Sequence, residues 1–288
     1  MSVQYPGPLV SPSWLAEHLE CGAIKVLDGS FHLPGSGRDP RADYRARHIP
    51  GARFFDIDGV NDKNTPLPHM LPAPDDFAAA ASDLGISNDD LVVVYDSPGS
   101  AAAARVWWTF RVFGHDRIAV LDGGLDAWLA EGRVVTDEPT PDRPARFIIA
   151  RFRPELVRSA ENVLAAMADP RVSIIDNRPA GRFAGADPEP RPARHLGHIP
   201  GSVNIPFARF LDPERGGAWR APDELRAAFR EAGMDPSGAI IAACGSGVTA
   251  ATTAFAAHLL GNDRVAVYDG SWAEWGNRDD LPTEAGTG

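Results

Sequence analysis

The chain has 288 residues, 44% of them hydrophobic, and a formal net charge of 28 − 39 = −11. This length is enough for two domains, no apolar run approaches the ~20 residues that cross a bilayer, and the acidic balance argues against nucleic acid or membrane as a partner. With two cysteines and no signal peptide visible in residues 1–6, we expect a reducing cytoplasm and no disulfide framework.

Strands and helices alternate along the chain. In chain order, we predict a helix over 74–84, a strand over 91–95, a helix over 101–113 and a strand over 118–121, then a helix over 222–232, a strand over 239–243, a helix over 248–260 and a strand over 264–268. Short apolar strands alternating with helices are typical of an α/β fold, with a mostly parallel sheet covered on both faces.

The second half of the chain repeats the first. The sequence His-Ile-Pro-Gly at His48 returns at His198, 198 − 48 = 150 residues later, and the strand that ends at Asp28 returns at Asp176, 176 − 28 = 148 residues later. Matches in the same order at nearly constant offset indicate a duplicated unit. We therefore predict two tandem domains, 1–138 and 157–288, joined by a linker rich in proline and arginine over 139–156.

Residues present in both copies are interpreted as serving the fold. On this ground we interpret His48 and His198 as structural, although a lone histidine would suggest catalysis. Asp28 and Asp176 close equivalent strands, and Asp176 could in addition orient a nearby arginine.

Cys244 has no counterpart in the first copy, because Asp96 stands at the equivalent position, 244 − 148 = 96. The cysteine ends an apolar strand and opens a glycine-punctuated loop, 245–249, before a predicted helix. Backbone N–H groups of 245–248 at such a helix start favour an anion, so a thiolate or persulfide would be stabilised there. We predict that Cys244 is the nucleophile and that only the second domain is catalytic. Cys21 is interpreted as an incidental small residue.

Four further polar residues lack a counterpart in the repeat. Arg182 and Arg191 lie on a proline-rich loop, where they could grip a carboxylate or simply form a solvated basic loop. His69 and Asp58 could be ordinary loop residues. Both lie in the first half, so a site that they share with Cys244 would lie in a cleft between the domains.

Over nearly its whole length the chain resembles the two-domain rhodanese-type sulfurtransferases. The resemblance rests on both His-Ile-Pro-Gly turns, on Phe-Phe-Asp-Ile-Asp at 54–58, His-Met-Leu-Pro at 69–72, Gly-Arg-Phe at 181–183, Pro-Glu-Pro-Arg at 188–191 and the cysteine loop. Thiosulfate-preferring members carry basic residues at the second and third loop positions. Gly245 and Ser246 stand there, as in the branch that uses 3-mercaptopyruvate.

The resemblance implies a role for each candidate residue. Cys244 would receive sulfur, Arg182 and Arg191 would bind the substrate carboxylate, and Ser246, His69 and Asp58 would form a proton relay. Ser246 could instead only hydrogen-bond the substrate ketone, with His69 orienting it. The remaining residues of the predicted binding loop are Gly245, Gly247, Val248 and Thr249.

The expected reaction moves sulfur from 3-mercaptopyruvate through a Cys244 persulfide to thioredoxin, glutathione or cyanide, in a monomer without cofactor or metal. The alternatives are a thiosulfate:cyanide sulfurtransferase and a non-enzymatic sulfur carrier. A phosphatase on a related fold is disfavoured, because Ala250 stands where its phosphate-binding arginine would be needed.

Overall fold

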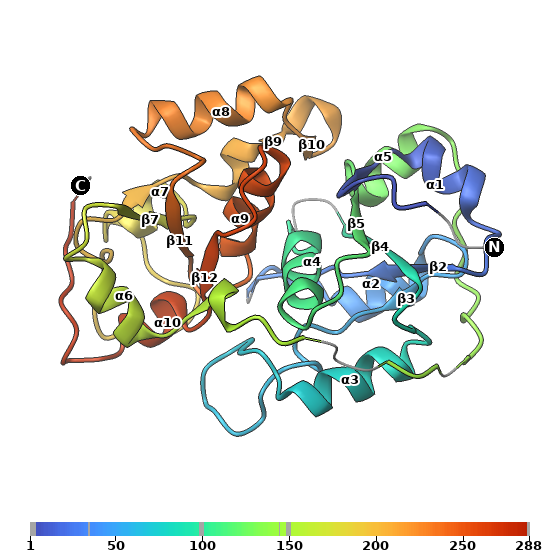
Figure 1. Cartoon of the computed structure of the whole chain (residues 1–288), viewed down its shortest axis with the longest axis horizontal. Coiled ribbons are helices and arrows are strands. Elements are labelled where there is room, and N and C mark those ends of the chain that lie inside the picture. Colours follow the sequence, from blue (N-terminus) through green and yellow to red (C-terminus); the bar gives the residue numbers. More distant parts are fainter. Residues whose placement is uncertain (1–3, 34, 98–100, 144, 148–150, 287–288) are drawn as a thin grey trace. The chain divides into compact units, whose positions relative to one another are not determined.

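The structure, a computed structural model, describes residues 4–33, 35–97, 101–143, 145–147 and 151–286. The predicted linker includes residues 144 and 148–150, which lie outside the described part. The chain forms two compact units: residues 1–62, 71–153 and 212–219 make up the first, and residues 63–70, 154–211 and 220–288 the second (Figure 1). The two short segments are equivalent in the repeat, 212 − 63 = 149, so each half contributes the same loop to the other unit.

The first unit is built on a five-stranded parallel sheet with the order β1-β5-β4-β2-β3. Its strands are β1 (Leu9–Val10), β2 (Ile24–Asp28), β3 (Arg53–Phe54), β4 (Leu91–Tyr95) and β5 (Ile118–Leu121). Its helices are α1 (Pro12–His18), α2 (Pro40–Ala46), α3 (Pro74–Asp83), α4 (Ala103–Val112) and α5 (Gly124–Ala130).

The second unit repeats this sheet in the order β6-β12-β11-β7-β8, again parallel. Its strands are β6 (Val157–Arg158), β7 (Val172–Asp176), β8 (Val203–Asn204), β11 (Ala239–Ala243) and β12 (Ala266–Tyr268). Its helices are α6 (Ala160–Ala166), α7 (Ala180–Phe183), α8 (Pro222–Glu231), α9 (Ala250–Leu259) and α10 (Ser271–Trp275). Strands β9 (Leu211–Asp212) and β10 (Ala218–Trp219) form a separate two-stranded sheet.

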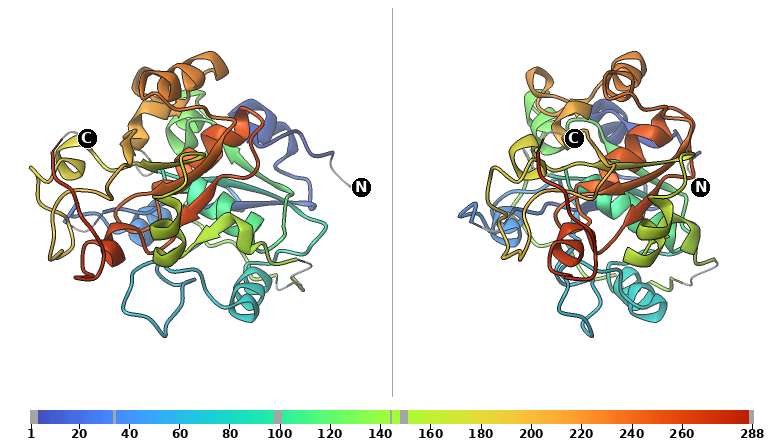
Figure 2. Two further views of the ribbon diagram at one scale, coloured as in Figure 1. Left: turned by 60° about the vertical axis from the view of Figure 1, so that its left-hand side comes forward. Right: turned by 90° about the vertical axis from the view of Figure 1, so that its left-hand side faces the viewer.

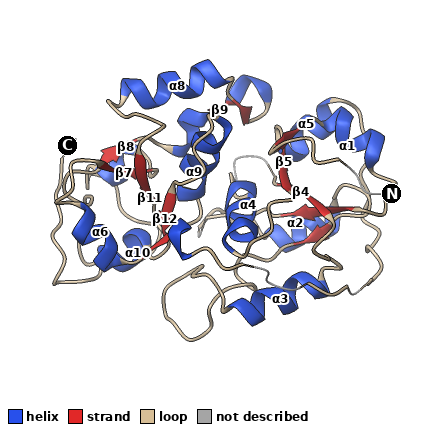
Figure 3. Ribbon diagram, in the orientation of Figure 1, coloured by secondary structure: helices blue, strands red, loops and turns tan. Residues whose placement is uncertain are grey.

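Apolar sequence on both sides of each central strand produces this layering. All five residues of β4 are buried, as are four of the five in β11. Helix α9 is apolar almost all round and packs against β11 and β12 (Figures 2 and 3). A strand buried on both faces reads as a continuous apolar run, and this explains why the sequence located β4, β5 and β11 at their observed bounds.

The predicted α/β fold with two parallel sheets is confirmed, with differences of one or two residues at helix ends and at the start of β12, which begins at Ala266 and not at residue 264. The helix predicted over 248–260 begins at Ala250, because residues 245–249 form the turns that carry the chain away from β11. At the carboxyl edge of the second sheet, β7 ends at Asp176 and β11 ends one residue before Cys244. Ligands of open parallel sheets bind at this edge.

The paired histidines make equivalent contacts in the two units. The ring Nδ1–H of His48 donates to the carbonyl of Tyr44, and that of His198 donates to the carbonyl of Phe183, at 2.8 and 2.9 Å. Each imidazole also stacks on the ring of the same residue. These contacts tie a turn to a helix in both halves and support the structural interpretation.

Candidate active site

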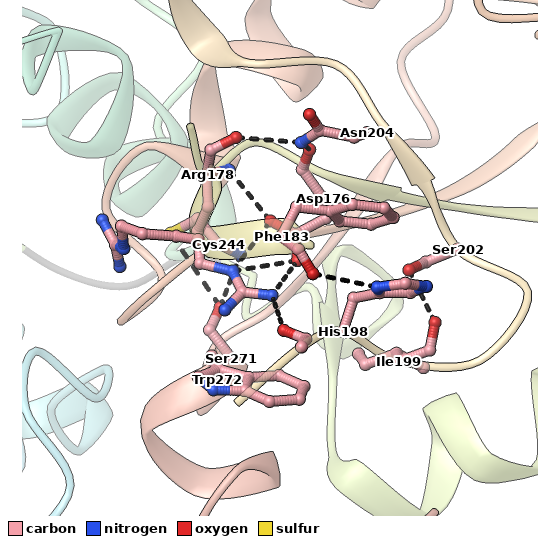
Figure 4. Close-up of polar contacts among 12 residues, drawn as sticks. Asp176, Arg178, Phe183, His198, Ile199, Ser202, Asn204, Cys244, Ser271 and Trp272 are labelled. Atoms are coloured by element: carbon pink, nitrogen blue, oxygen red, sulfur yellow. Dashed lines mark hydrogen bonds and ion pairs between the residues drawn. The ribbon is translucent and has the colours of Figure 1, made fainter. Parts of the chain in front are cut away.

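Cys244 lies directly after β11 and is 2% exposed. The fully buried hydroxyl of Ser271 is central to its surroundings: Ser271 Oγ accepts the backbone N–H groups of Cys244 and Gly247, both at 3.1 Å, and lies 4.0 Å from Cys244 Sγ (Figure 4). The same hydroxyl donates to the carbonyl of Tyr268 at 2.7 Å. Of the loop N–H groups that were predicted to face an anion, that of Gly247 therefore donates to Ser271 instead. These contacts of Ser271 hold the loop closed around the thiol.

Helix α10 fixes the outer side of the same loop. The N–H of Trp272 donates to the carbonyl of Cys244 and that of Ala273 to the carbonyl of Gly245, at 3.0 and 2.8 Å. Ser271 has a φ of 49°, a left-handed conformation that few residues other than glycine adopt. Its counterpart in the first unit, Gly124, has a φ of 54°, so the turn is a property of the repeat and the hydroxyl is an addition of the second copy.

Arg182 lies beside the first residue of the cysteine loop. A Cβ atom built on Gly245 would lie 2.7 Å from Arg182 Nη2, closer than real carbon contacts allow. Residue 245 therefore lacks a side chain for a packing reason as well as a conformational one. The guanidinium, and not a loop side chain, supplies positive charge at this position.

A buried network of charges holds Arg182. Arg178 is 1% exposed and donates to both carboxylate oxygens of Asp176 (Figure 4). It also donates to Glu189 at 2.7 Å. Its guanidinium also donates to the carbonyl of Gly197 and stacks over Trp272 at 4.4 Å from the ring centroid. Glu189 in turn accepts from Arg182. The sequence interpretation that Asp176 orients an arginine is confirmed, and the arginine is Arg178.

Arg191 connects two other predicted residues. Its Nη2 lies 2.9 Å from His69 Nε2, and its Nη1 lies 3.5 Å from Ser246 Oγ. Because a guanidinium only donates, His69 Nε2 accepts, which places the proton of the neutral imidazole on Nδ1. His69, with a φ of 60°, and Ser246 are both buried. The second unit thus brings His69, from the first half of the chain, to the same loop as Cys244, with Arg191 linking His69 and Ser246.

The other predicted residues fall into two groups. Val248 is buried in the loop, and Thr249 is the residue that precedes α9 and accepts the backbone N–H of Thr252. Asp58 is exposed, belongs to the first unit, and donates its backbone N–H to Asp56. Its part in a proton relay stays a prediction.

Sequence reasoning missed Ser271, Arg178 and Glu189. For Ser271 a signal was present: it stands where the first copy has Gly124, a polar residue without a repeat counterpart, which is the criterion that identified Cys244. Arg178 satisfies the same criterion, because its counterpart is Ser30, 178 − 148 = 30. Ser30 repeats the backbone contact, its N–H donating to Asp28 as that of Arg178 donates to Asp176, but its hydroxyl brings no positive charge to the carboxylate.

The first unit carries a carboxylate at the place of the thiol. Asp96 Oδ2 accepts the N–H of Ala103, the first residue of α4, at 2.9 Å. Residues 98–100 of this loop lie outside the described part. A carboxylate at a helix start takes up the N–H groups that an anion would otherwise bind, and it has no sulfur to exchange.

Asp96 gives the first unit a pH-dependent stability. Burial raises its pKa to about 6, although the hydrogen bond from Ala103 lowers it. An unfolded aspartate titrates near 3.9, so between about pH 4 and pH 6 the folded state keeps a proton that the unfolded state releases. The free energy of unfolding therefore falls as the pH rises from about 4 to about 6. Asp96→Asn removes this loss and is expected to raise the free energy of unfolding by about 1–3 kcal/mol at neutral pH and far less near pH 4.

Urea unfolding of the full chain at a series of pH values checks this expectation. The exposed Asp137→Asn is the matched control and should leave the pH profile unchanged. A gain that is the same at both ends of the pH range would contradict the assignment to Asp96.

In the part of the chain that the structure describes, no group of three or more histidine, cysteine or carboxylate side chains is arranged to hold a metal ion. The described helices also include none that is long and apolar enough to span a bilayer.

A buried cysteine in a tight loop at the carboxyl edge of a parallel sheet, next to two arginines, is the site of an enzyme of thiol-dependent group transfer. Comparison with known proteins identifies the family. The Rhodanese-like domain matches residues 11–131 and 159–278. The chain belongs to the rhodanese-like family and contains two of its domains.

Its relatives confirm the predicted class of enzyme, one that transfers sulfur. The chain is 45% identical over 273 residues to 3-mercaptopyruvate sulfurtransferase of Rattus norvegicus, covering 93% of this chain and 91% of that protein. It is also 45% identical over 287 residues to thiosulfate sulfurtransferase of the same species, covering 97% and 95%. The crystal structure of SseA from Escherichia coli, described among 3-mercaptopyruvate sulfotransferases, superposes with a TM-score of 0.82 at 38% identity, covering 93% of this chain and 99% of that one.

Proposed function

We propose that the protein is a 3-mercaptopyruvate sulfurtransferase that passes sulfur to a thiol or to cyanide through a persulfide on Cys244. One observation carries the choice of donor: the positive charge beside the cysteine loop comes from Arg182, packed against Gly245, while the loop positions 245 and 246 carry no cation. A planar guanidinium suits a carboxylate, which it binds through two parallel hydrogen bonds.

The proposed first half-reaction conserves atoms and electrons. The Cys244 thiolate attacks the thiol sulfur of 3-mercaptopyruvate, an S–S bond forms, and the C–S bond breaks with its electron pair on carbon. The methylene carbon is reduced and Cys244 is oxidised. The carbanion is the enolate of pyruvate, which takes up the proton that the transferred sulfur carried, so that pyruvate and a Cys244 persulfide anion result. In the second half-reaction an acceptor thiolate or cyanide attacks the outer sulfur and restores the thiolate.

The buried surroundings of Cys244 support a persulfide intermediate. The thiol is 2% exposed, so a bound sulfur would be shielded from water and from other thiols. Ser271 Oγ, 4.0 Å from Cys244 Sγ and already anchored to two loop N–H groups, keeps the loop geometry fixed through both half-reactions.

Ser246 and His69 are proposed to act on the enolate side of the reaction. Arg191 contacts both residues, so a donor carboxylate bound by Arg191 would place its neighbouring ketone beside the Ser246 hydroxyl. In this role Ser246 hydrogen-bonds the developing enolate and His69 orients Arg191. A proton relay that includes Asp58 stays a prediction.

Sequence identity does not separate the two donors, since mercaptopyruvate and thiosulfate relatives are equally similar, and thiosulfate is therefore the second candidate. Steady-state kinetics with cyanide as acceptor test the proposal. We expect kcat/KM for 3-mercaptopyruvate to exceed that for thiosulfate at least about tenfold, because thiosulfate lacks the carboxylate that charge-assisted hydrogen bonds recognise.

Release of one pyruvate for each thiocyanate formed would establish the proposed stoichiometry. A preference for thiosulfate would overturn the choice of donor and leave sulfur transfer intact. Thioredoxin and glutathione in place of cyanide then rank the thiol acceptors.

A further inference from the structure

We infer that Glu189 is a positioning residue that aims Arg182 at the donor carboxylate and thereby sets selectivity for carboxylate-bearing sulfur donors. The inference rests on the proposed function and assigns a role to a residue that touches neither Cys244 nor the expected substrate position. Each of the two carboxylate oxygens of Glu189 accepts hydrogen bonds from a different arginine.

The Glu189 carboxylate is 6% exposed and bridges two guanidinium groups. Oε1 accepts from Arg178 Nη1 at 2.7 Å, and Oε2 accepts from Arg182 Nε at 3.0 Å and also from Arg182 Nη2. Contact with Nε and Nη2 occupies the lateral edge of the Arg182 guanidinium. Because two of its nitrogens are held by the same carboxylate, the planar guanidinium of Arg182 cannot rotate freely about the last bonds of the side chain.

Glu189 is itself held from the sheet. Arg178, on its other side, is anchored to Asp176 at the end of β7, to the carbonyl of Gly197 and to the ring of Trp272. Positive and negative groups alternate from the strand end outward, in the order Asp176, Arg178, Glu189 and Arg182. Rigid strand geometry is transmitted in this way to a guanidinium on a four-residue helix, α7, that is too short to fix it alone.

The contacts of Arg182 leave its other edge for a ligand. Glu189 uses the Nε–H and one N–H of Nη2, which leaves three of the five donors. Among the described residues, none accepts a hydrogen bond from Nη1. Nη2 lies against Gly245, where a side chain's Cβ would come within 2.7 Å of it, so the remaining edge is next to the loop that Cys244 opens. An edge with two parallel N–H groups matches a carboxylate.

The first unit shows that the fold does not require this network. At the position of Arg178 it has Ser30, whose N–H donates to Asp28, and it has Asp96 in place of Cys244. The alternating charges from Asp176 to Arg182 thus occur in the second unit, which carries Cys244. This coincidence points to a role in the reaction and not in holding the sheet together.

Glu189→Gln tests the inference, because an amide has one acceptor oxygen and an NH2 group that would oppose a guanidinium. We expect kcat/KM for 3-mercaptopyruvate to fall about tenfold to a hundredfold, mainly through KM, with kcat/KM for thiosulfate changed less than about threefold. Discharge of preformed persulfide to cyanide should keep its rate. Glu231→Gln is the matched control, since Glu231 pairs with Arg209 on the exposed face of α8.

A double-mutant cycle separates positioning from folding. If Glu189 acts through Arg182, then Glu189→Gln should cost little further in an Arg182→Ala background. Equal losses with both donors, or slower persulfide discharge, would assign Glu189 a merely structural role and overturn the inference, as would an unchanged KM for 3-mercaptopyruvate. Should Glu189→Gln fail to fold, Glu189→Asp keeps the charge but withdraws the acceptor from Arg182, and the same donor-specific loss is expected.

Binding to Cys244→Ser protein distinguishes failure of the inference from failure of the proposed function. Calorimetric titration with 3-mercaptopyruvate measures carboxylate recognition without turnover, and Glu189→Gln should weaken it about tenfold or more. If the wild-type chain binds this donor but does not release pyruvate from it, the proposed function fails while the inference is still decided by the titration. Equal affinity with and without Glu189→Gln rejects the inference alone.

Discussion

Cys244→Ser is expected to abolish sulfur transfer from 3-mercaptopyruvate and from thiosulfate alike. A serine hydroxyl at neutral pH is neither ionised nor able to hold a transferred sulfur as a persulfide, so both half-reactions are lost. Serine fits the space of the buried thiol and can keep the loop contacts of Ser271, so the thermal midpoint should move by no more than a few degrees. We expect turnover at the background rate, and mass spectrometry should show no added sulfur atom after incubation with the donor.

Cys21→Ser is the matched control for this experiment. Cys21 is the other cysteine of the chain, half-buried and packed against the core of the first unit. Its replacement should leave turnover and persulfide formation at wild-type levels. Sulfur that is still transferred by Cys244→Ser, or lost in Cys21→Ser, would show that the nucleophile has been misassigned.

Arg178→Leu is expected to destabilise the second unit by about 3–5 kcal/mol, because it leaves two buried carboxylates without their counter-charge. Asp176 and Glu189 both depend on this guanidinium, which is 1% exposed. Leucine replaces part of the packing on Trp272 but none of the hydrogen bonds. Thermal or urea unfolding of the full chain should show the loss as an earlier transition of the second unit.

The exposed Arg171→Leu provides the control for removing an arginine. Arg171 pairs with Asp169 on the surface of the same unit, with 86% of its side chain exposed, and such pairs contribute about 0–1 kcal/mol. A loss below about 1 kcal/mol in Arg178→Leu would contradict the conclusion that the network is anchored at Arg178.

Prediction of the fold succeeded where one signal dominated. The buried strands β4, β5 and β11 have apolar residues at successive positions, and the two helices that begin at Pro74 and Pro222 have a proline that fits only a first turn. The start of α9 was predicted two residues early, since the turns between Cys244 and Ala250 depend on contacts with Ser271 and α10, which are distant in the sequence.

Prediction of the site depended on subtraction of one half of the chain from the other. Cys244, the predicted nucleophile, and Arg182 and Arg191, the predicted carboxylate-binding residues, were singled out in this way, since each lacks a repeat counterpart. The method applied equally to Ser271 and Arg178, but their neighbours along the chain gave no chemical reason to single them out. Glu189 acquires its role only from the two arginines that share its carboxylate.

The amino-acid sequence alone establishes the duplicated α/β architecture, the one cysteine that directly follows a central apolar strand and the lack of a cation at the second and third loop positions. These properties are local or periodic, and each depends on residues that are close in the chain. Tertiary contacts determine which charges meet. Asp176 and Glu189 reach Arg178 and Arg182 through a folded loop, and His69 comes to the unit that contains Cys244 from more than half the chain away. A buried charge requires a partner of opposite charge, and the fold decides which residues lie close enough to be that partner. The spacing of residues in the sequence does not give their distance in the folded chain.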